Sequence, residues 1–207
     1  MPKIIQVIFI HGGMTFKSHR DYLRYLKTKK AKLGEINYWS GRFLTQALGR
    51  KFQITRPRMP QQDDAKYAEW KIAFERYVPL LKNNVILIGA SLGGIFLAKY
   101  LSEHKFPKKL LSVYLVCTPF DHHLPTEDLV GGFRLKKDLS LLQKNCKNLY
   151  LLFSKDDDVV PVSHAAKYAK ALPQAKIIIY RNKKGHFYVR TFPEIVKLIK
   201  NDVKNRS

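Results

Sequence analysis

NVILIGASLGGIFLAKY, residues 84–100, is the stretch that decides the fold. An apolar, β-branched run is followed by G-x-S-x-G and then by apolar residues at helical spacing, which predicts a strand, a sharp turn and a helix. In that context the serine sits on a strained turn that exposes its hydroxyl at the top of a sheet. Ser91 is therefore the candidate nucleophile. Gly89 and Gly93 are expected to lie so close that a Cβ on either would clash.

Glycines around a serine also occur in the phosphate-binding turns of dinucleotide-binding folds. That alternative is weakened because neither G-x-G-x-x-G nor the Lys-Ser/Thr ending of a P-loop occurs near the turn. A catalytic serine on this turn, which is called a nucleophile elbow, would instead require an acid and a histidine further along the chain, in that order.

Composition favours one soluble globular unit with an unusual charge. The 207 residues suit a single domain, 1–207, because domains usually have about 50–250 residues. The aromatic content of 12% argues against disorder. The formal net charge is +22, but the lysines form short clusters along the whole chain instead of one arm or stripe. We expect a solvated basic surface and no nucleic acid as the main partner.

The two cysteines predict neither a disulfide nor a metal site. Cys117 and Cys146 form no C-x-x-C pair and no zinc-ligand spacing, so we expect buried free thiols and no bound metal. The apolar run 4–10 is far shorter than the roughly 20 residues of a membrane span, and no export signal is visible. A cytoplasmic protein without a membrane span is expected.

Apolar runs and helical periodicities alternate along the chain. Strands are predicted at 3–10, 52–55, 85–88, 110–117, 148–153 and 175–180, and helices at 41–50, 65–81, 91–104, 135–143, 163–171 and 192–204. This alternation predicts an α/β, three-layer fold, in which helices cover both faces of a six-stranded, mostly parallel sheet. The polar and aromatic connection before residue 41 is either a pocket wall or lid, or an ordinary surface excursion.

An acid and a histidine occur where the elbow requires them. Ligands of such sheets gather beyond the carboxyl ends of the strands, and 156–158 and His186 follow the fifth and sixth strands. A serine hydroxyl needs a neighbouring imidazole to take its proton, and a carboxylate to orient that imidazole. We assign His186 as the base. Asp157, four residues before Pro161, is the preferred acid, and Asp156 is the alternative.

Backbone N–H groups are the usual stabilisers of the oxyanion that forms in acyl transfer. One expected donor is Leu92, which directly follows the nucleophile. The other comes from the loop after the first strand, with Gly13 preferred and Met14 the alternative. The residues expected to contact substrate are Met14, Met59, Thr118 and Phe120.

The remaining histidines receive other roles. His11 is expected to shape the loop after the first strand, and His122 and His123 are candidates for the pocket lining. Those expected on surface segments are His19, His104 and His164.

Four motifs resemble the α/β-hydrolase superfamily: His11-Gly12-Gly13, Gly89-Ala90-Ser91-Leu92-Gly93-Gly94, Asp157-Asp158-Val159-Val160-Pro161 and Gly185-His186-Phe187. More narrowly, Arg58-Met59-Pro60 and Trp70 resemble compact serine hydrolases related to the retinoblastoma-binding-protein hydrolases and their bacterial relatives. The resemblance implies a minimal core with no large cap, and ester or amide hydrolysis through an acyl-enzyme. Ala90 departs from the histidine often found before the nucleophile, which leaves substrate preference open.

These patterns predict a serine hydrolase, with carboxylic esters of small or medium acyl groups as substrates and no metal or organic cofactor. One alternative is a weak or inactive hydrolase-fold binding protein whose basic surface holds nucleic acid or an acidic partner. Acyl transfer to an acceptor other than water would use the same triad. The oligomeric state is not predicted.

Overall fold

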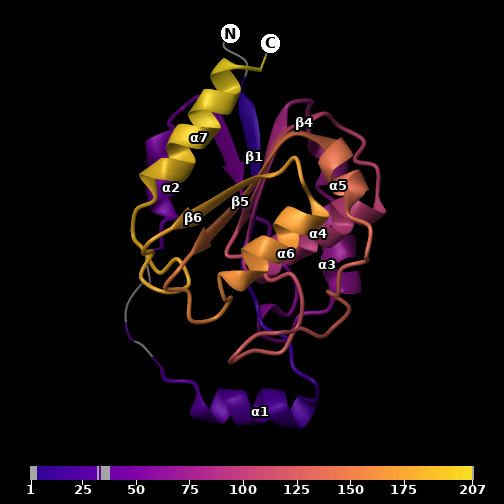
Figure 1. Cartoon of the computed structure of the whole chain (residues 1–207), viewed down its shortest axis with the longest axis vertical. Coiled ribbons are helices and arrows are strands. Elements are labelled where there is room, and N and C mark those ends of the chain that lie inside the picture. Colours follow the sequence, from indigo (N-terminus) through magenta and orange to yellow (C-terminus); the bar gives the residue numbers. More distant parts are fainter. Residues whose placement is uncertain (1–3, 32, 34–37, 207) are drawn as a thin grey trace.

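A parallel sheet runs through the centre of the computed structural model, which describes residues 4–31, 33 and 38–206 (Figure 1). Its strands are β1 (Ile5–Ile10), β2 (Phe52–Thr55), β3 (Val85–Ala90), β4 (Leu110–Val116), β5 (Cys146–Ser154) and β6 (Lys176–Tyr180). They lie in the order β2-β1-β3-β4-β5-β6, and every neighbouring pair is parallel. This confirms the predicted sheet. Lys3, the first residue of the predicted N-terminal strand, lies outside the described residues.

Helices cover both faces of the sheet. They are α1 (His19–Thr28), α2 (Arg42–Leu48), α3 (Tyr67–Glu75), α4 (Leu92–Glu103), α5 (Ser140–Asn145), α6 (Ser163–Ala171) and α7 (Pro193–Lys204), with 3-10 turns η1 (Gln62–Asp64) and η2 (Val78–Leu80). Helices α2 and α7 pack on one face, and α3 to α6 pack on the other (Figure 1). The predicted three-layer α/β architecture is confirmed.

Each face of the sheet has its own aromatic core. On the α3–α6 face, Phe96 meets Phe74 and Trp70 edge-on, with ring centroids 5.5 and 5.8 Å apart. On the α2 and α7 face, Trp39 meets Phe192 edge-on at 5.2 Å. Aromatic pairs in these orientations contribute roughly 0.5–1.5 kcal/mol beyond the area they bury. The central strands are buried on both sides, which explains why they read as continuous apolar runs.

A buried carboxylate ties the last helix to the sheet. Asp202 of α7 is 7% exposed. It accepts hydrogen bonds from the hydroxyls of Tyr114 (2.6 Å), Tyr150 (2.8 Å) and Ser112. Burial and the adjacent carboxylate raise the pKa values of both tyrosines, so the phenols stay protonated as donors. This polar cluster fixes α7 on its face of the sheet.

Two predicted helices differ from the observed ones. The expected helix 65–81 ends as α3 at Glu75 and resumes only as the turn η2, which contains Pro79. Proline has no N–H to continue the helical hydrogen bonds, so the break is expected at that position. The expected helix 135–143 begins later, at Ser140.

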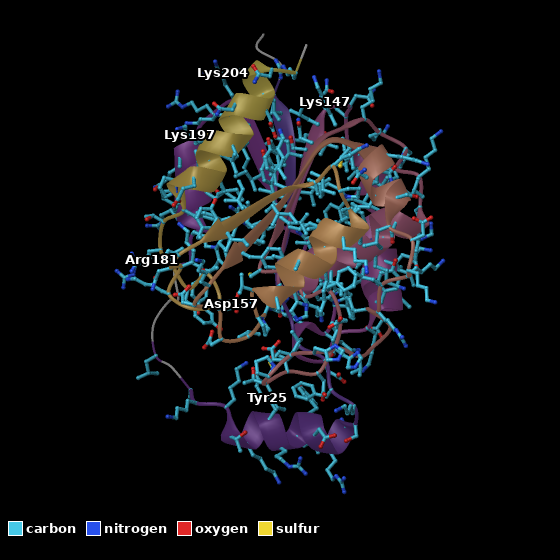
Figure 2. The ribbon with its side chains drawn as sticks, in the orientation of Figure 1. Tyr25, Lys147, Asp157, Arg181, Lys197 and Lys204 are labelled. Carbon is cyan, nitrogen blue, oxygen red and sulfur yellow. The ribbon has the colours of Figure 1, made fainter. Side chains whose placement is uncertain are left out.

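The sequence pattern did not predict α1. Ser18 caps it, since its hydroxyl accepts the Asp21 N–H at 3.2 Å, but no residue of the helix is buried. Tyr22 and Tyr25 contact Phe16, with ring centroids 5.5 and 5.2 Å apart. Figure 2 shows Tyr25 pointing from α1 toward the body of the molecule. Helix α1 therefore lies beyond one end of the sheet, attached by aromatic contacts (Figure 1).

Basic side chains are spread over the molecule. Figure 2 shows Lys147 and Lys204 at the end away from α1, Lys197 on the outer side of α7, and Arg181 on a flank. This distribution agrees with a solvated basic surface. Within the described part of the chain, none of the helices has the length and apolar character needed to span a membrane.

Candidate active site

Ser91 occupies the tight turn between β3 and α4. Its φ of 52° lies in the left-handed region, which residues other than glycine rarely adopt. Two backbone hydrogen bonds hold the turn. The Ser91 N–H donates to the Val116 carbonyl of β4, and the Ser91 carbonyl accepts from the Gly94 N–H, each at 2.9 Å. Strain of this kind is typical of a nucleophile elbow, and it places the serine at the carboxyl edge of the sheet.

The glycines of the elbow allow two close approaches. A Cβ on Gly89 would stand 2.5 Å from the Gly93 carbonyl oxygen, which confirms the predicted clash between the two. A Cβ on Gly93 would overlap the carbonyl oxygens of Ile10 and His11. The start of α4 is therefore packed on the end of β1 as well as on its own strand.

His186 and Asp157 meet at the same edge of the sheet, after β6 and β5. The His186 Nδ1 atom lies 2.9 Å from both carboxylate oxygens. The Asp157 side chain is 1% exposed and that of His186 is 11% exposed. Asp157 Oδ1 also accepts the backbone N–H groups of Val159 (2.9 Å) and Val160 (2.8 Å). These bonds hold the carboxylate in place to accept Nδ1–H, which in the neutral ring leaves Nε2 as the acceptor.

Asp156, the alternative acid, serves the loop that carries His186. It accepts the N–H groups of Lys183 and Gly185, each at 2.9 Å, and the Ser154 hydroxyl. Burial raises the pKa of Asp156, but these hydrogen bonds outweigh that effect and lower the pKa to about 2. Asp156 thus positions the histidine loop instead of contacting the imidazole.

Cys117 belongs to this site, although sequence reasoning treated it only as a buried free thiol. Its Sγ, a ring nitrogen of His186 and a carboxylate oxygen of Asp157 all lie within 4.8 Å of one another. Cys117 is 2% exposed and has a left-handed φ of 42°. Its N–H donates to the Leu152 carbonyl at 2.8 Å. The position directly after β4, beside the elbow strand, was the signal that could have revealed it.

Opposing effects act on the charged groups here. Burial would lower the pKa of His186, but the adjacent Cys117 thiol and Asp157 carboxylate raise it well above its ordinary value. Burial raises the pKa of Glu127; His186 opposes this, and the charges of Asp157 and Asp158 add to it. Acidic groups therefore gather beside the imidazole in a chain whose net charge is +22.

Ser91 and the cluster of Cys117, Asp157 and His186 are both joined to the end of β4. The Ser91 N–H is bonded to Val116, and the next residue, Cys117, contacts the imidazole cluster. His186 Nε2 is buried and has no hydrogen-bond partner among the described residues. In that part of the chain, the nitrogen that a triad needs for the serine proton is therefore not hydrogen-bonded to Ser91 Oγ.

The loop of residues 11–14 lies beside Ser91. A Cβ on Gly12 would be 3.3 Å from the Ser91 Cβ and 3.8 Å from its Oγ. The Met14 N–H donates to the Gln62 carbonyl at 2.9 Å, so this alternative oxyanion donor is already engaged. A Cβ on Gly13 would stand 2.7 Å from the same carbonyl oxygen, so only glycine fits there.

His11 braces this loop. Its Nδ1–H donates to the Gly12 carbonyl at 2.6 Å, and its Nε2 accepts the Met59 N–H at 3.1 Å. Burial lowers the pKa of His11, despite the bond to Gly12, which favours the neutral ring that this pairing requires. The ring also packs edge-on against Trp70 at 5.5 Å. His11 therefore links the loop to the segment around Met59.

Two of the expected substrate contacts line hollows on either side of α1. Met14 lines one of about 490 Å³, between α1 and residues 124–128. Met59 lines another of about 600 Å³, between α1 and residues 60–64. The connection that contains α1 thus forms a wall of both hollows.

Phe120 and Thr118 lie on the loop after β4. Phe120 lines a third hollow, of about 680 Å³, which also includes residues 134–137. Thr118 is fully buried and its hydroxyl donates to the Val116 carbonyl at 3.2 Å. A Cβ on Gly94 would overlap the Thr118 side chain, so Thr118 packs against the elbow helix.

The expected surface position of His164 is wrong. His164 is fully buried, its Nδ1 accepts the Phe120 N–H at 2.9 Å, and its Nε2 lies 3.0 Å from the His123 carbonyl oxygen. The helical pattern of α6 did not show that its first turn packs beneath the loop after β4.

A parallel sheet with a serine elbow, an acid and a histidine in that order at its carboxyl edge defines the α/β-hydrolase fold. Within it, the chain belongs to the serine hydrolase family, whose model matches residues 34–199.

Relatives agree with this assignment. A Bacillus subtilis (strain 168) protein named as the hydrolase YdeN is 25% identical over 157 residues, which cover 75% of this chain and 81% of that protein. The crystal structure of the B. subtilis ydeN gene product has a TM-score of 0.77 at 20% identity, covering 97% of this chain and 99% of the other. A Burkholderia cenocepacia structure described as an aryl esterase has a TM-score of 0.60 at 11% identity, covering 99% and 93%. These structures are similar in fold. The narrower likeness to the retinoblastoma-binding-protein hydrolases stays a prediction.

Proposed function

We propose that this protein is a serine carboxylesterase that cleaves small or medium acyl esters through Ser91, His186 and Asp157. The observation that carries the proposal is the buried His186–Asp157 pair, held at 2.9 Å beside the strained serine elbow. Membership of the serine hydrolase family supports the same reaction class.

In the proposed reaction, Ser91 Oγ attacks the ester carbonyl while its proton moves to His186 Nε2. The imidazolium that forms is stabilised by Asp157, which also holds the tautomer before the attack. The oxyanion accepts hydrogen bonds from the N–H groups of Leu92 and Gly13. Leu92 is the first residue of α4, so its N–H has no acceptor within the helix.

The tetrahedral intermediate then collapses. The ester C–O bond breaks, the leaving alcohol takes the proton from His186, and the acyl group stays on Ser91. Water next gives a proton to His186 and attacks the acyl-enzyme; the acyl C–O bond then breaks, His186 returns the proton to Ser91 Oγ, and the acid is released. No step requires a metal or an organic cofactor.

The surroundings of the site bear on substrate and location. The hollows beside α1 suit groups of modest size, since ligand pockets have about 300–1,000 Å³. Cys117 and Cys146 are both free thiols, which supports the proposed cytoplasmic location.

A fluorophosphonate probe tests the nucleophile. The unmodified protein should be labelled and should hydrolyse p-nitrophenyl acetate. Ser91→Ala and His186→Ala should lose both the labelling and the hydrolysis. Ser102→Ala is the matched control on the same helix, because its hydroxyl donates to the Lys99 carbonyl within that helix, at 2.8 Å. Ser102→Ala should behave as the unmodified protein.

Two results would overturn the proposal. Labelling that persists in Ser91→Ala would place the nucleophile elsewhere. Absence of turnover together with steeply salt-dependent binding to heparin or DNA would instead support the binding-protein alternative.

A further inference from the structure

Three chemically different donors converge beside the serine elbow. A thiol, an imidazole nitrogen and a carboxylate oxygen, from Cys117, His186 and Asp157, lie within 4.8 Å of one another. They come from three separate strand ends, after β4, β6 and β5. The proposed esterase reaction uses the histidine and the aspartate but gives the thiol no role.

We propose that Cys117, His186 and Asp157 form a binding site for Zn²⁺, and that Zn²⁺ bound there stops the hydrolase. The inhibitory part rests on the proposed function of His186, whereas the binding part stands on the donor geometry alone.

The donor set fits zinc in type and spacing. Zinc takes thiolate sulfur at about 2.3 Å and imidazole nitrogen or carboxylate oxygen at about 2.0–2.2 Å, so tetrahedral donors stand roughly 3.4–3.6 Å apart. Donors already within 4.8 Å need only small side-chain movements to reach that spacing. A thiolate favours zinc over magnesium, which prefers oxygen ligands.

Local charge also favours a cation at this point. The chain carries 38 basic and 16 acidic residues, yet the charges of Asp157, Asp158 and His186 all reach Glu127, so acidic groups gather here.

Zinc would block the proposed base by changing its tautomer. Nδ1 faces the Asp157 carboxylate at 2.9 Å, so a cation shared by the three groups replaces the Nδ1 proton. The thiol proton of Cys117 is released, and the imidazole proton moves from Nδ1 to Nε2. His186 Nε2 then carries a proton and cannot accept the one from Ser91.

Binding is tested with Co²⁺ as a spectroscopic substitute for Zn²⁺. Coordination by Cys117 should give a thiolate-to-cobalt charge-transfer band in the near ultraviolet that Zn²⁺ abolishes and Mg²⁺ does not. Cys117→Ser and Cys117→Ala should lose the band. Cys146→Ser is the matched control, because the Cys146 thiol hydrogen-bonds the Leu142 carbonyl, at 3.5 Å, and is not in the cluster with His186. No band in the unmodified protein, or an equal band in a folded Cys117 variant, overturns the site.

Inhibition is tested on the rate of fluorophosphonate labelling with buffered Zn²⁺. Losing a partner outside the ligand shell costs about 10–100-fold in metal affinity, so loss of the direct ligand Cys117 should weaken inhibition by at least about tenfold. EDTA should restore the rate, and Cys146→Ser should remain sensitive. Equal inhibition of the Cys117 and Cys146→Ser variants overturns the proposal. A cobalt band without inhibition overturns its inhibitory half. If the protein is not labelled at all, the proposed esterase fails, and the cobalt band still decides whether the site exists.

Discussion

Replacing Asp157 with asparagine isolates the orienting role of the carboxylate. Oδ1 accepts the N–H groups of Val159 and Val160 at 2.9 and 2.8 Å, so an asparagine must keep its carbonyl oxygen at that position. Its NH₂ group then takes the place of Oδ2, 2.9 Å from His186 Nδ1. That donor faces Nδ1 as closely as the retained Oδ1 does, and its hydrogen bond to Nδ1 favours the ring proton on Nε2, which is the wrong tautomer for a base.

The same change in a serine protease triad lowers kcat by about 10⁴, which is roughly 5.4 kcal/mol of transition-state stabilisation. We expect a loss of this size in kcat for p-nitrophenyl acetate, with an equally slowed rate of fluorophosphonate labelling. Asp158→Asn, at the adjacent acid, is the control and should stay within about threefold of the unmodified protein. A folded Asp157→Asn variant that keeps more than a tenth of the activity would refute the reasoning.

Three further changes test the framework of the site. Asp202→Ala leaves three buried hydroxyls without their acceptor, at about 1–3 kcal/mol each, so the free energy of unfolding in urea should fall by about 3 kcal/mol or more; a loss below 1 kcal/mol would contradict this role. Gly89→Ala places a Cβ 2.5 Å from a carbonyl oxygen, so we expect about 1–3 kcal/mol of destabilisation and slower probe labelling, and unchanged urea unfolding would disprove the close approach. Burial raises the pKa of Asp121, but the Lys167 ion pair outweighs it and the pKa falls below its usual range. Lys167→Met should therefore reduce stability at neutral pH, and its difference from the unmodified protein should shrink progressively as the pH falls from about 3.9 through the lowered pKa of Asp121. A difference that persists in acid would exclude the ion pair as its cause.

The layers of the fold and the elbow followed from patterns that are local in the sequence. A buried parallel strand is a continuous apolar run, and the turn of residues 89–93 needs glycine at fixed places. Both can be read without knowing what packs against them. The order of serine, acid and histidine likewise placed three groups at one edge, because the carboxyl ends of parallel strands share that edge.

The parts that were missed depend on contacts between distant segments. Nothing in the sequence around Cys117 shows that its thiol meets an imidazole 69 residues later (117 to 186). The sequence favoured Asp157 as the acid but left Asp156 open. The folded loops direct Asp157 to His186 and Asp156 to the backbone of the histidine loop. His164 is buried by the loop that folds over α6. Helix α1 was not predicted because it buries no residue.

Helix α1 walls two hollows near the site without adding a residue to either core. Substitutions on the side of α1 that faces these hollows would change their shape and cost the folded state little stability. Under the proposed esterase function, changes in α1 would therefore alter substrate preference separately from thermal stability.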